Sequence, residues 1–379
     1  MTAEFANQTE NSALKNAIVE KIGRDGPMSF HDFMETVLYH PTLGYYSGDR
    51  VQIGREGDYL TSPEVSPLFG AMVGRQLLEM WELMGRPATF DAVEAGAGNG
   101  TLARDILGWA RRTAPDFAKA VRYAVIEVSQ SLVRRQTQSL EAEGLAGEVR
   151  WLREPPSGVR GCVFANELLD AMPVHRVRVR DGRLSEIHVT WDGERFGETE
   201  MAADGRLAEY FERLSLLPGD ESLAEVNSGA PLWTNSAATG IERGFLLLFD
   251  YGYEAEELYA PWRKDGTLMC FYRHNPSTDP YTRIGRQDMT SHVDFTTIRR
   301  TGEEAGLTTL GLLSQSEFLA NLGIGDALAT PDGGEIEEYF ARRRAVMELL
   351  DPGGLGRIKA LVQGRGVDGA LLRGLAGGV

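Results

Sequence analysis

Three glycines alternate with other residues directly after an apolar run that contains an acid, in the segment FDAVEAGAGNGTL at 90–102. Gly96, Gly98 and Gly100 would let the backbone turn sharply and let a ligand approach it closely. A strand, a tight glycine turn and a helix together form the nucleotide site of a doubly wound α/β sheet. We therefore expect a nucleotide-like ligand at this turn.

Two ligands compete for the turn. A dinucleotide needs the spacing G-x-G-x-x-G, but here the third glycine comes one residue early and Thr101 takes its expected place. Glu94 would repel a pyrophosphate, whereas it would attract S-adenosyl-L-methionine (SAM), which carries an ammonium and a sulfonium but no phosphate. The pattern favours SAM and makes a dehydrogenase the least favoured enzyme, with an ordinary glycine-rich loop as the structural alternative.

A second acid lies at the end of the next β-branched run, YAVIEV at 123–128. An acid at the end of the second strand of such a sheet can accept hydrogen bonds from both ribose hydroxyls of a nucleotide. We predict this role for Glu127. A solvated acid at a strand end is the alternative.

Two further acids follow the apolar segment GCVFA and are candidates for catalysis. Glu167 and Asp170 should lie at the carboxyl end of a strand, where open α/β sheets bind ligands. If the segment turns into a helix, the i, i+3 spacing puts both carboxylates on one face. We expect both to face the methyl acceptor and Asn166 to lie near the methionine end of SAM. Asp170 could instead cap a turn, and Asp250, after FLLLFD, could line the same cleft or serve as a turn acid.

His292 is a third candidate catalytic residue, in the segment DMTSHVDF at 288–295. A histidine with a pKa near neutral is the usual general base for a hydroxyl acceptor. Asp294 is a candidate N-cap for a helix that starts at Phe295. The remaining five histidines receive no role.

Composition limits the function classes. The chain has 379 residues, of which 42% are hydrophobic and 25% charged, and its net charge is −16. This charge argues against broad nucleic-acid binding, which needs lysine and arginine surfaces. Cys162 and Cys270 lie in apolar runs, and we expect both to be buried free thiols. No Cys/His cluster has metal-ligand spacing, so we expect no metal. No targeting peptide is apparent, and no apolar run approaches the roughly 20 residues of a membrane span.

The hydrophobic pattern predicts an α/β fold. Helices are expected over 12–39, broken at Gly26-Pro27, and over 68–84. Alternation on both sides of Asp181-Gly182 predicts a β-hairpin, followed by a helix near 205–215. Core strands are predicted at 90–95, 123–128, 148–152, 161–165 and 244–250, and a late helix over 335–350. We divide the chain into an N-terminal helical region with a SAM-covering loop (1–88), the first part of the core (89–173), an inserted hairpin and helix (174–240), and the rest of the core with C-terminal helices (241–379).

An ordered set of motifs resembles a known family. The motifs are GDYLTSPEVSPLFG (57–70), VEAGAGNGTL (93–102), VIEVS (125–129), FANELLDAMPVHR (164–176), LFDYG (248–252) and DMTSHVDF (288–295). They resemble the MidA-like methyltransferases, the group that includes a mitochondrial complex I assembly methyltransferase. The resemblance covers roughly residues 15–365. It implies a Rossmann-like SAM-dependent methyltransferase sheet with N-terminal helices and an inserted α+β subdomain.

The resemblance also implies a role for the loop at 57–64. Taken alone, Ser62 could be the N-cap and Pro63 the first residue of the following helix, which needs no ligand. The family adds that this loop folds over SAM, with Thr61, Ser62 and Glu64 as contacts.

We therefore predict a SAM-dependent methyltransferase that modifies an arginine side chain of a protein. A small-molecule O- or N-methyltransferase would instead want an apolar pocket and a single base such as His292. A SAM-binding assembly factor would bind SAM without turnover. We expect a protein or small-molecule acceptor as partner, no nucleic acid, a homodimer as one assembly compatible with the sequence, and a cytoplasmic location.

Overall fold

The computed structural model describes residues 10–47, 54, 57–328, 336–367 and 369–376. A seven-stranded sheet forms its centre, in the order β16-β17-β10-β5-β2-β3-β4. The first five strands in sequence run parallel to one another, whereas β17 runs antiparallel to both β10 and β16. The strands are β2 (Phe90–Ala95), β3 (Val121–Ile126), β4 (Val149–Leu152), β5 (Val159–Asn166), β10 (Ile241–Asp250), β16 (Thr308–Ser314) and β17 (Lys359–Arg365).

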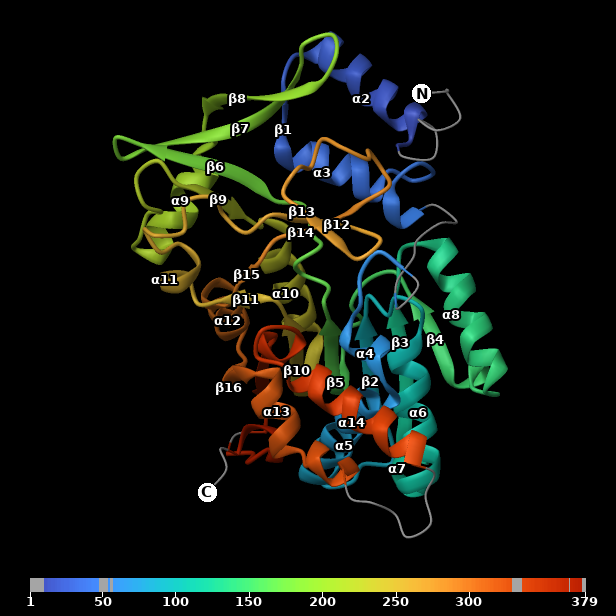
Figure 1. Ribbon diagram of the computed structural model, residues 1–379. Helices are drawn as coiled ribbons and strands as arrows, with labels where there is room; N and C mark the ends of the chain where they lie inside the picture. The colour runs from blue at the N-terminus through green and yellow to red at the C-terminus, as the bar shows by residue number, and fades with distance from the viewer. Residues whose placement is uncertain (1–9, 48–53, 55–56, 329–335, 368, 377–379) are drawn as a thin grey trace.

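Helices cover both faces of this sheet (Figure 1). Alternate strand residues enter two separate apolar clusters, as Phe164 and Val163 of β5 do, because successive side chains point to opposite faces. Burial on both faces explains why these strands are continuous apolar runs. One face packs against α5 (Pro67–Leu83), α6 (Thr101–Thr113), α7 (Pro115–Ala120), α13 (Gln315–Asn321) and α14 (Ile336–Leu350), and the other against α10 (Gly229–Gly240) and α12 (Phe295–Glu304).

A second, antiparallel sheet joins the N-terminal region to the inserted segment. The predicted hairpin is present as β6 (His175–Arg180) and β7 (Arg183–Trp191). The hairpin extends to β1 (Met28–Ser29), β8 (Phe196–Ala202) and β9 (Leu223–Val226), which the sequence analysis did not predict. Figure 1 shows this sheet beside α2 (Ser12–Asp25) and α3 (Phe30–Tyr39), with α9 (Gly205–Leu214) nearby. The four-part division of the chain stays a prediction, but 1–88 and 174–240 share this sheet.

One longer helix, α8, and several short elements complete the fold. The helical ones are α4 (Ser62–Val65), α8 (Gln130–Ala142), α11 (Ala255–Leu258) and the 3-10 turns Tyr45–Ser47, Ala146–Glu148, Ile324–Leu328, Leu355–Arg357 and Arg373–Leu375. The strands are β11 (Gly252–Tyr253), β12 (Met269–Tyr272), β13 (Asn275–Ser277), β14 (Asp288–Thr290) and β15 (Val293–Asp294). Cys162 and Cys270 are buried free thiols, as predicted. Within the described residues, no helix combines the length and apolar character that crossing a bilayer requires.

The predicted helix start at Ser62 is wrong. Thr61 is the N-cap of the short α4, without a side-chain hydrogen bond, and the long helix α5 has its own cap at Ser66. The Ser66 hydroxyl accepts from the amide of Leu68, and Pro67 follows it. The Ser-Pro signal occurs twice within a few residues, and only the second copy caps the long helix.

Candidate active site

The glycine turn after β2 has the geometry that its sequence predicted. Gly96, Gly98 and Gly100 have φ of 68°, 53° and 79°, in the left-handed region that favours glycine. A Cβ on Gly96 would lie 2.8 Å from the Leu168 side chain, so a larger residue would displace that neighbour. The turn therefore brings the backbone close to the segment that follows β5.

Glu94 lies in β2 below this turn and is buried. Its Oε2 accepts a 2.6 Å hydrogen bond from the Tyr123 hydroxyl on β3. Burial raises the pKa of Glu94 to about 7. The carboxyl is therefore partly protonated near neutral pH, and a nearby cation would favour its charged form.

Glu127 follows β3 directly, because the strand ends at Ile126 rather than at the predicted residue 128. Its carboxylate accepts hydrogen bonds from the Ser129 amide at 2.9 Å and from Gln136 Nε2 at 3.1 Å. Burial raises its pKa. The acid is thus fixed in direction at the carboxyl end of the sheet, as a ribose-binding acid must be.

Three adjoining cavities open at this end of the sheet. The largest has a volume of about 950 Å³ and is lined among others by Gly96, Gly98, Glu127, Val128, Leu168 and Trp233. A small one of about 50 Å³ lies against Glu94, Asn99 and Asn166. The third, of about 540 Å³, is named here the acceptor cavity and is lined among others by Asp58, Asp170, Asp288 and His292. Glu167 and Tyr59 line all three cavities.

Glu167 is therefore the carboxyl at the junction of the three cavities. Its φ is 51°, and its Oε1 accepts hydrogen bonds from the Ser62 amide at 3.2 Å and from Asn166 Nδ2 at 2.9 Å. Burial raises its pKa to about 8. The expected helix through 167–170 does not form. The chain turns there instead, and the turn still brings Glu167 and Asp170 into one cavity.

Asp170 and Asp250 have different roles in this turn. Asp170 lines the acceptor cavity, and burial together with repulsion from Asp250 raises its pKa well above the usual range. Asp250 accepts hydrogen bonds from the amides of Leu168 and Leu169, so it is a turn acid rather than a cleft acid. Burial raises the pKa of Asp250 to about 7 despite these amides.

Two acids of the acceptor cavity escaped the sequence analysis. Asp288 accepts a 2.6 Å hydrogen bond from the Tyr46 hydroxyl, and burial raises its pKa to about 6. Asp58 accepts from the Tyr45 hydroxyl at 2.9 Å and from the Arg273 amide at 2.8 Å. Asp58 lies in the motif GDYLTSPEVSPLFG and Asp288 in the motif DMTSHVDF. Membership in these motifs of the family resemblance was the signal that could have identified them.

His292 lines the same cavity as Glu167 and Asp170. Its Nδ1 is buried without a hydrogen-bond partner among the described residues, and its amide donates to Thr267 Oγ1. Burial lowers its pKa to about 4, so the imidazole is neutral at physiological pH. Asp294 is the predicted N-cap of α12, since its carboxylate accepts from the amides of Thr296 and Thr297.

The loop before α5 reaches the glycine turn. Glu64 Oε1 accepts hydrogen bonds from Thr101 Oγ1 at 2.7 Å and from Asn99 Nδ2 at 3.2 Å, and Thr61 and Glu64 both line the small cavity. The Ser62 side chain does not match the expected SAM contact. Its hydroxyl donates to Gln315 and it lines none of the three cavities, so it acts through its amide, which holds Glu167. Residues 48–53 and 55–56 of the predicted covering loop lie outside the described residues.

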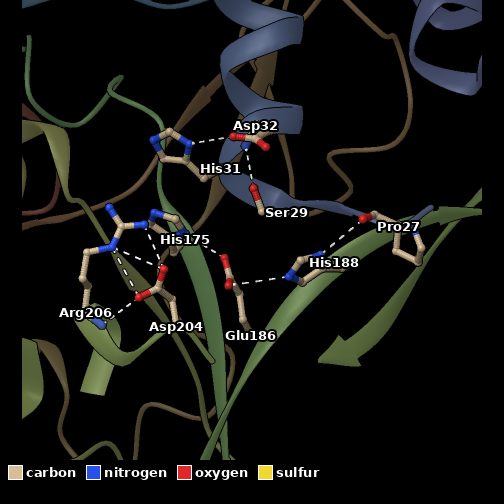
Figure 2. Close-up of polar contacts among 9 residues, drawn as sticks. All are labelled: Pro27, Ser29, His31, Asp32, His175, Glu186, His188, Asp204 and Arg206. Carbon is tan, nitrogen blue, oxygen red and sulfur yellow. Dashed lines mark hydrogen bonds and ion pairs between the residues drawn. The ribbon is translucent and has the colours of Figure 1, made fainter. Parts of the chain in front are cut away.

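Three other histidines gather between α3 and the hairpin, away from the cavities (Figure 2). The rings of His31 and His175 stack with centroids 4.6 Å apart. Glu186 contacts His175 Nδ1 at 2.7 Å and His188 Nε2 at 3.5 Å. These side chains join the N-terminal helices to the inserted sheet.

Comparison with known proteins places the chain in a family. Residues 72–313 match the family model described as "Putative S-adenosyl-L-methionine-dependent methyltransferase". The chain belongs to this family. It is a SAM-dependent methyltransferase, and the predicted fold class is confirmed, since a Burkholderia thailandensis protein solved with S-adenosyl-homocysteine shares 34% identity. That alignment covers 97% of this chain and 95% of the other, with a TM-score of 0.88.

The chain is also similar in sequence to named proteins from animals. The chain is 30% identical to the mitochondrial "Protein arginine methyltransferase NDUFAF7 homolog" of Drosophila melanogaster, over 83% of this chain and 76% of the relative. It is 28% identical to the mitochondrial NDUFAF7 of Homo sapiens, over 81% and 72%. The prediction of a cytoplasmic location is contradicted by this comparison, because these relatives are mitochondrial proteins by name.

The residues at the sheet end fit the cofactor of the family. The glycine turn admits a ligand against the backbone, and Glu127 is fixed at the rim of the large cavity. Asn166 Oδ1 is buried beside the small cavity without a hydrogen-bond partner, an acceptor suited to an ammonium group. Glu127 would hold the ribose, and Asn166 with the glycine turn the amino-acid end.

Proposed function

We propose that this methyltransferase transfers the methyl group to an arginine side chain of a protein. The observation that carries the proposal is the position of Glu167, which borders the two cavities at the glycine turn and also the acceptor cavity. A group held by Glu167 in the acceptor cavity lies next to the cofactor cavity. The names of the NDUFAF7 relatives support the same acceptor.

The acceptor cavity is suited to a cation. Five carboxyls line it: Asp58, Glu167, Asp170, Asp265 and Asp288. Burial raises the pKa of Glu167, Asp170 and Asp288. The charged form of each carboxyl is therefore disfavoured in the absence of a positive partner. A guanidinium, with a pKa above about 12, would supply that partner and draw the carboxyls into their charged forms.

The same carboxyls supply the chemistry that the acceptor needs. Bound SAM provides a methyl group on a sulfonium, and transfer requires a nitrogen lone pair directed at it. A guanidinium nitrogen becomes nucleophilic when carboxylates fix its plane and accept the proton that the methylated nitrogen releases. Glu167 is the acid best placed for both tasks, and Asp170 would complete the clamp.

One observation favours a second candidate, methylation of a hydroxyl or amine on a small molecule. The neutral His292 has an unpaired Nδ1 and lines the acceptor cavity, as a general base for such an acceptor would. The five carboxyls of this cavity weigh against it, because a neutral hydroxyl does not offset the cost of burying them.

Quantitative mass spectrometry of the host proteome tests the acceptor. Cells with the gene, without it, and with the Glu167→Gln variant are compared for peptides that lose one CH₂ increment. We expect a methylarginine that is present only with the wild-type gene. An increment restored by the wild-type gene on a hydroxyl-bearing metabolite, with every methylarginine unchanged, would contradict the proposal.

A further inference from the structure

Five side chains at the acceptor cavity are linked by contacts, three rings with a guanidinium at each end: Arg357, Tyr251, His292, Tyr253 and Arg263. The guanidinium of Arg357 lies 5.4 Å from the centre of the Tyr251 ring, and that of Arg263 lies 4.8 Å from the centre of the Tyr253 ring. His292 lies between the two tyrosines, with its ring centroid 6.3 Å from Tyr251 and 5.2 Å from Tyr253. All but Tyr253 line the cavity.

The two arginines are held by rings rather than by acids. Among the residues that the structure describes, no carboxylate lies within ion-pair distance of either guanidinium. Asp265 also lines the cavity and forms an ion pair with neither. Arg263 packs against Trp262 as well, at 4.7 Å, and its Nε is buried without a hydrogen-bond partner. Stacking fixes the plane of a guanidinium and leaves its N–H edge available to a carboxylate or another planar anion.

The cavity therefore holds two separate charged groups. Arg263 and Arg357 are cationic, whereas Asp58, Glu167, Asp170, Asp265 and Asp288 are acidic, and no ion pair joins the two groups within the described part of the chain. Both arginines also lower the pKa of His292, after burial, which places their charges near the imidazole. A ligand that satisfies both groups must carry a cation and an anion on one molecule.

We propose that the enzyme selects protein segments in which an acidic side chain lies close to the acceptor arginine, and that Arg263 and Arg357 form the cationic side of the cavity that attracts its carboxylate. This specificity rests on the proposed function, because it assumes that the acidic group of the cavity receives the guanidinium. The same carboxylate chemistry could come from the end of a chain, so the test separates an internal acid from a terminal one.

Peptide binding measured by fluorescence anisotropy, with S-adenosyl-homocysteine present, tests the selection. End-blocked peptides carry one arginine and one glutamate at successive positions on either side, and matched peptides carry glutamine instead. We expect the best glutamate peptide to bind about tenfold more tightly than its glutamine partner, the effect of one hydrogen-bonded charge. Equal affinities at every position would overturn the proposal, as would tight binding confined to peptides with a free terminal carboxylate.

Charge reversal gives the sharper test. In the Arg263→Glu and Arg357→Glu variants, the preference for glutamate should disappear and peptides with lysine at the same position should gain affinity. Arg183→Glu, at the exposed tip of the hairpin, makes the same change of charge and should keep the preference. Arg263→Gln and Arg357→Gln remove the charge with a smaller change, should either reversal fail to fold. A loss of S-adenosyl-homocysteine affinity in these variants, with the peptide preference intact, would assign the arginines to the cofactor and overturn the proposal.

The two hypotheses fail in different ways. If the proposed function is wrong, the glutamate preference appears in binding but no arginine peptide gains a methyl group by mass spectrometry. If the specificity is wrong, arginine peptides are methylated equally whatever their neighbours are.

Discussion

The carboxylate of Asp250 accepts a 2.8 Å hydrogen bond from the amide of Leu169, a residue 81 positions earlier in the chain. The same oxygen accepts from the Leu168 amide at 3.2 Å, and the other oxygen accepts from the Tyr251 amide at 2.9 Å. Because β5 and β10 are parallel neighbours, an acid at the end of one strand fixes the turn that follows the other. That turn carries Glu167 and Asp170, so Asp250 positions both acids without lining their cavity.

Replacing this acid should therefore separate catalysis from cofactor binding. In Asp250→Asn, the side-chain amide cannot accept all three backbone hydrogen bonds, and we expect a loss of about 1–3 kcal/mol of stability. Methyl transfer should fall on the order of 100-fold because the acids move, while calorimetric affinity for S-adenosyl-homocysteine changes little. Asp181→Asn, in the exposed hairpin turn, is the control. An active variant with unchanged stability would show that the turn holds without Asp250.

Glu167→Gln keeps the size of the junction side chain and removes its charge. We expect S-adenosyl-homocysteine to bind as in the wild type, because the amide oxygen can still accept from the Ser62 amide. Methyl transfer should fall by roughly 10²–10⁴, the usual effect of losing a positioned acid or base. Single-turnover assays with saturating SAM measure the transfer step directly. Full activity would remove Glu167 from the reaction.

The raised pKa of Glu167 also predicts a dependence of stability on pH. Its folded-state pKa is about 8, whereas an unfolded glutamate titrates near 4.3, so the folded protein binds more protons. Stability from this group is complete below the unfolded value and is lost as the pH rises through the folded one. Urea unfolding should therefore show that Glu167→Gln becomes more stable relative to the wild type as the pH rises from 5 to 9. Parallel curves for the two proteins would place the pKa of Glu167 in its ordinary range.

Local patterns in the sequence predicted the backbone around the glycine turn, whereas the contacts with the cofactor stay a prediction. The glycine turn, the strands of the central sheet and Glu127 are each specified by a few neighbouring residues, and the structure has the expected geometry at each. The same holds for the hairpin across Asp181-Gly182. Such features depend on backbone conformation and on alternation of apolar residues, which a single sequence displays directly.

Features that depend on distant partners were missed. The two-residue strand β1 exists only because it pairs with β7, some 160 residues away by the register of Ser29 with His188, and nothing in its own sequence indicates a strand. The helix expected from Glu167 to Asp170 does not form, and the distant Asp250 holds the amides of Leu168 and Leu169 in the turn that takes its place. Asp288 became a site residue only through burial beside Tyr46. In each case the deciding contact lies outside the local window.

Glu127 gives a direct test of the cofactor cavity. Both ribose hydroxyls would donate to its carboxylate, so Glu127→Ala should weaken S-adenosyl-homocysteine binding by about tenfold or more. Glu127→Gln keeps one acceptor oxygen and should show a smaller loss. Circular dichroism checks α8, whose first turn begins beside the Ser129 amide that Glu127 holds. Unchanged affinity in the alanine variant, measured by calorimetry, would exclude the ribose role.

Glu186 should stabilise the junction between α3 and the hairpin in a pH-dependent manner. Burial acts to raise its pKa, but the hydrogen bond and charge of His175, together with His188, hold the pKa below its ordinary value. A lowered carboxyl pKa gives stability that is present above the unfolded value and is lost as the pH falls through the folded one. Glu186→Gln should thus cost roughly 1 kcal/mol near pH 7 and little near pH 3. Urea unfolding at both pH values measures this difference, with Glu209→Gln on the exposed face of α9 as the control. A cost of equal size at both pH values would mean that packing, and not the charge of Glu186, joins the two elements.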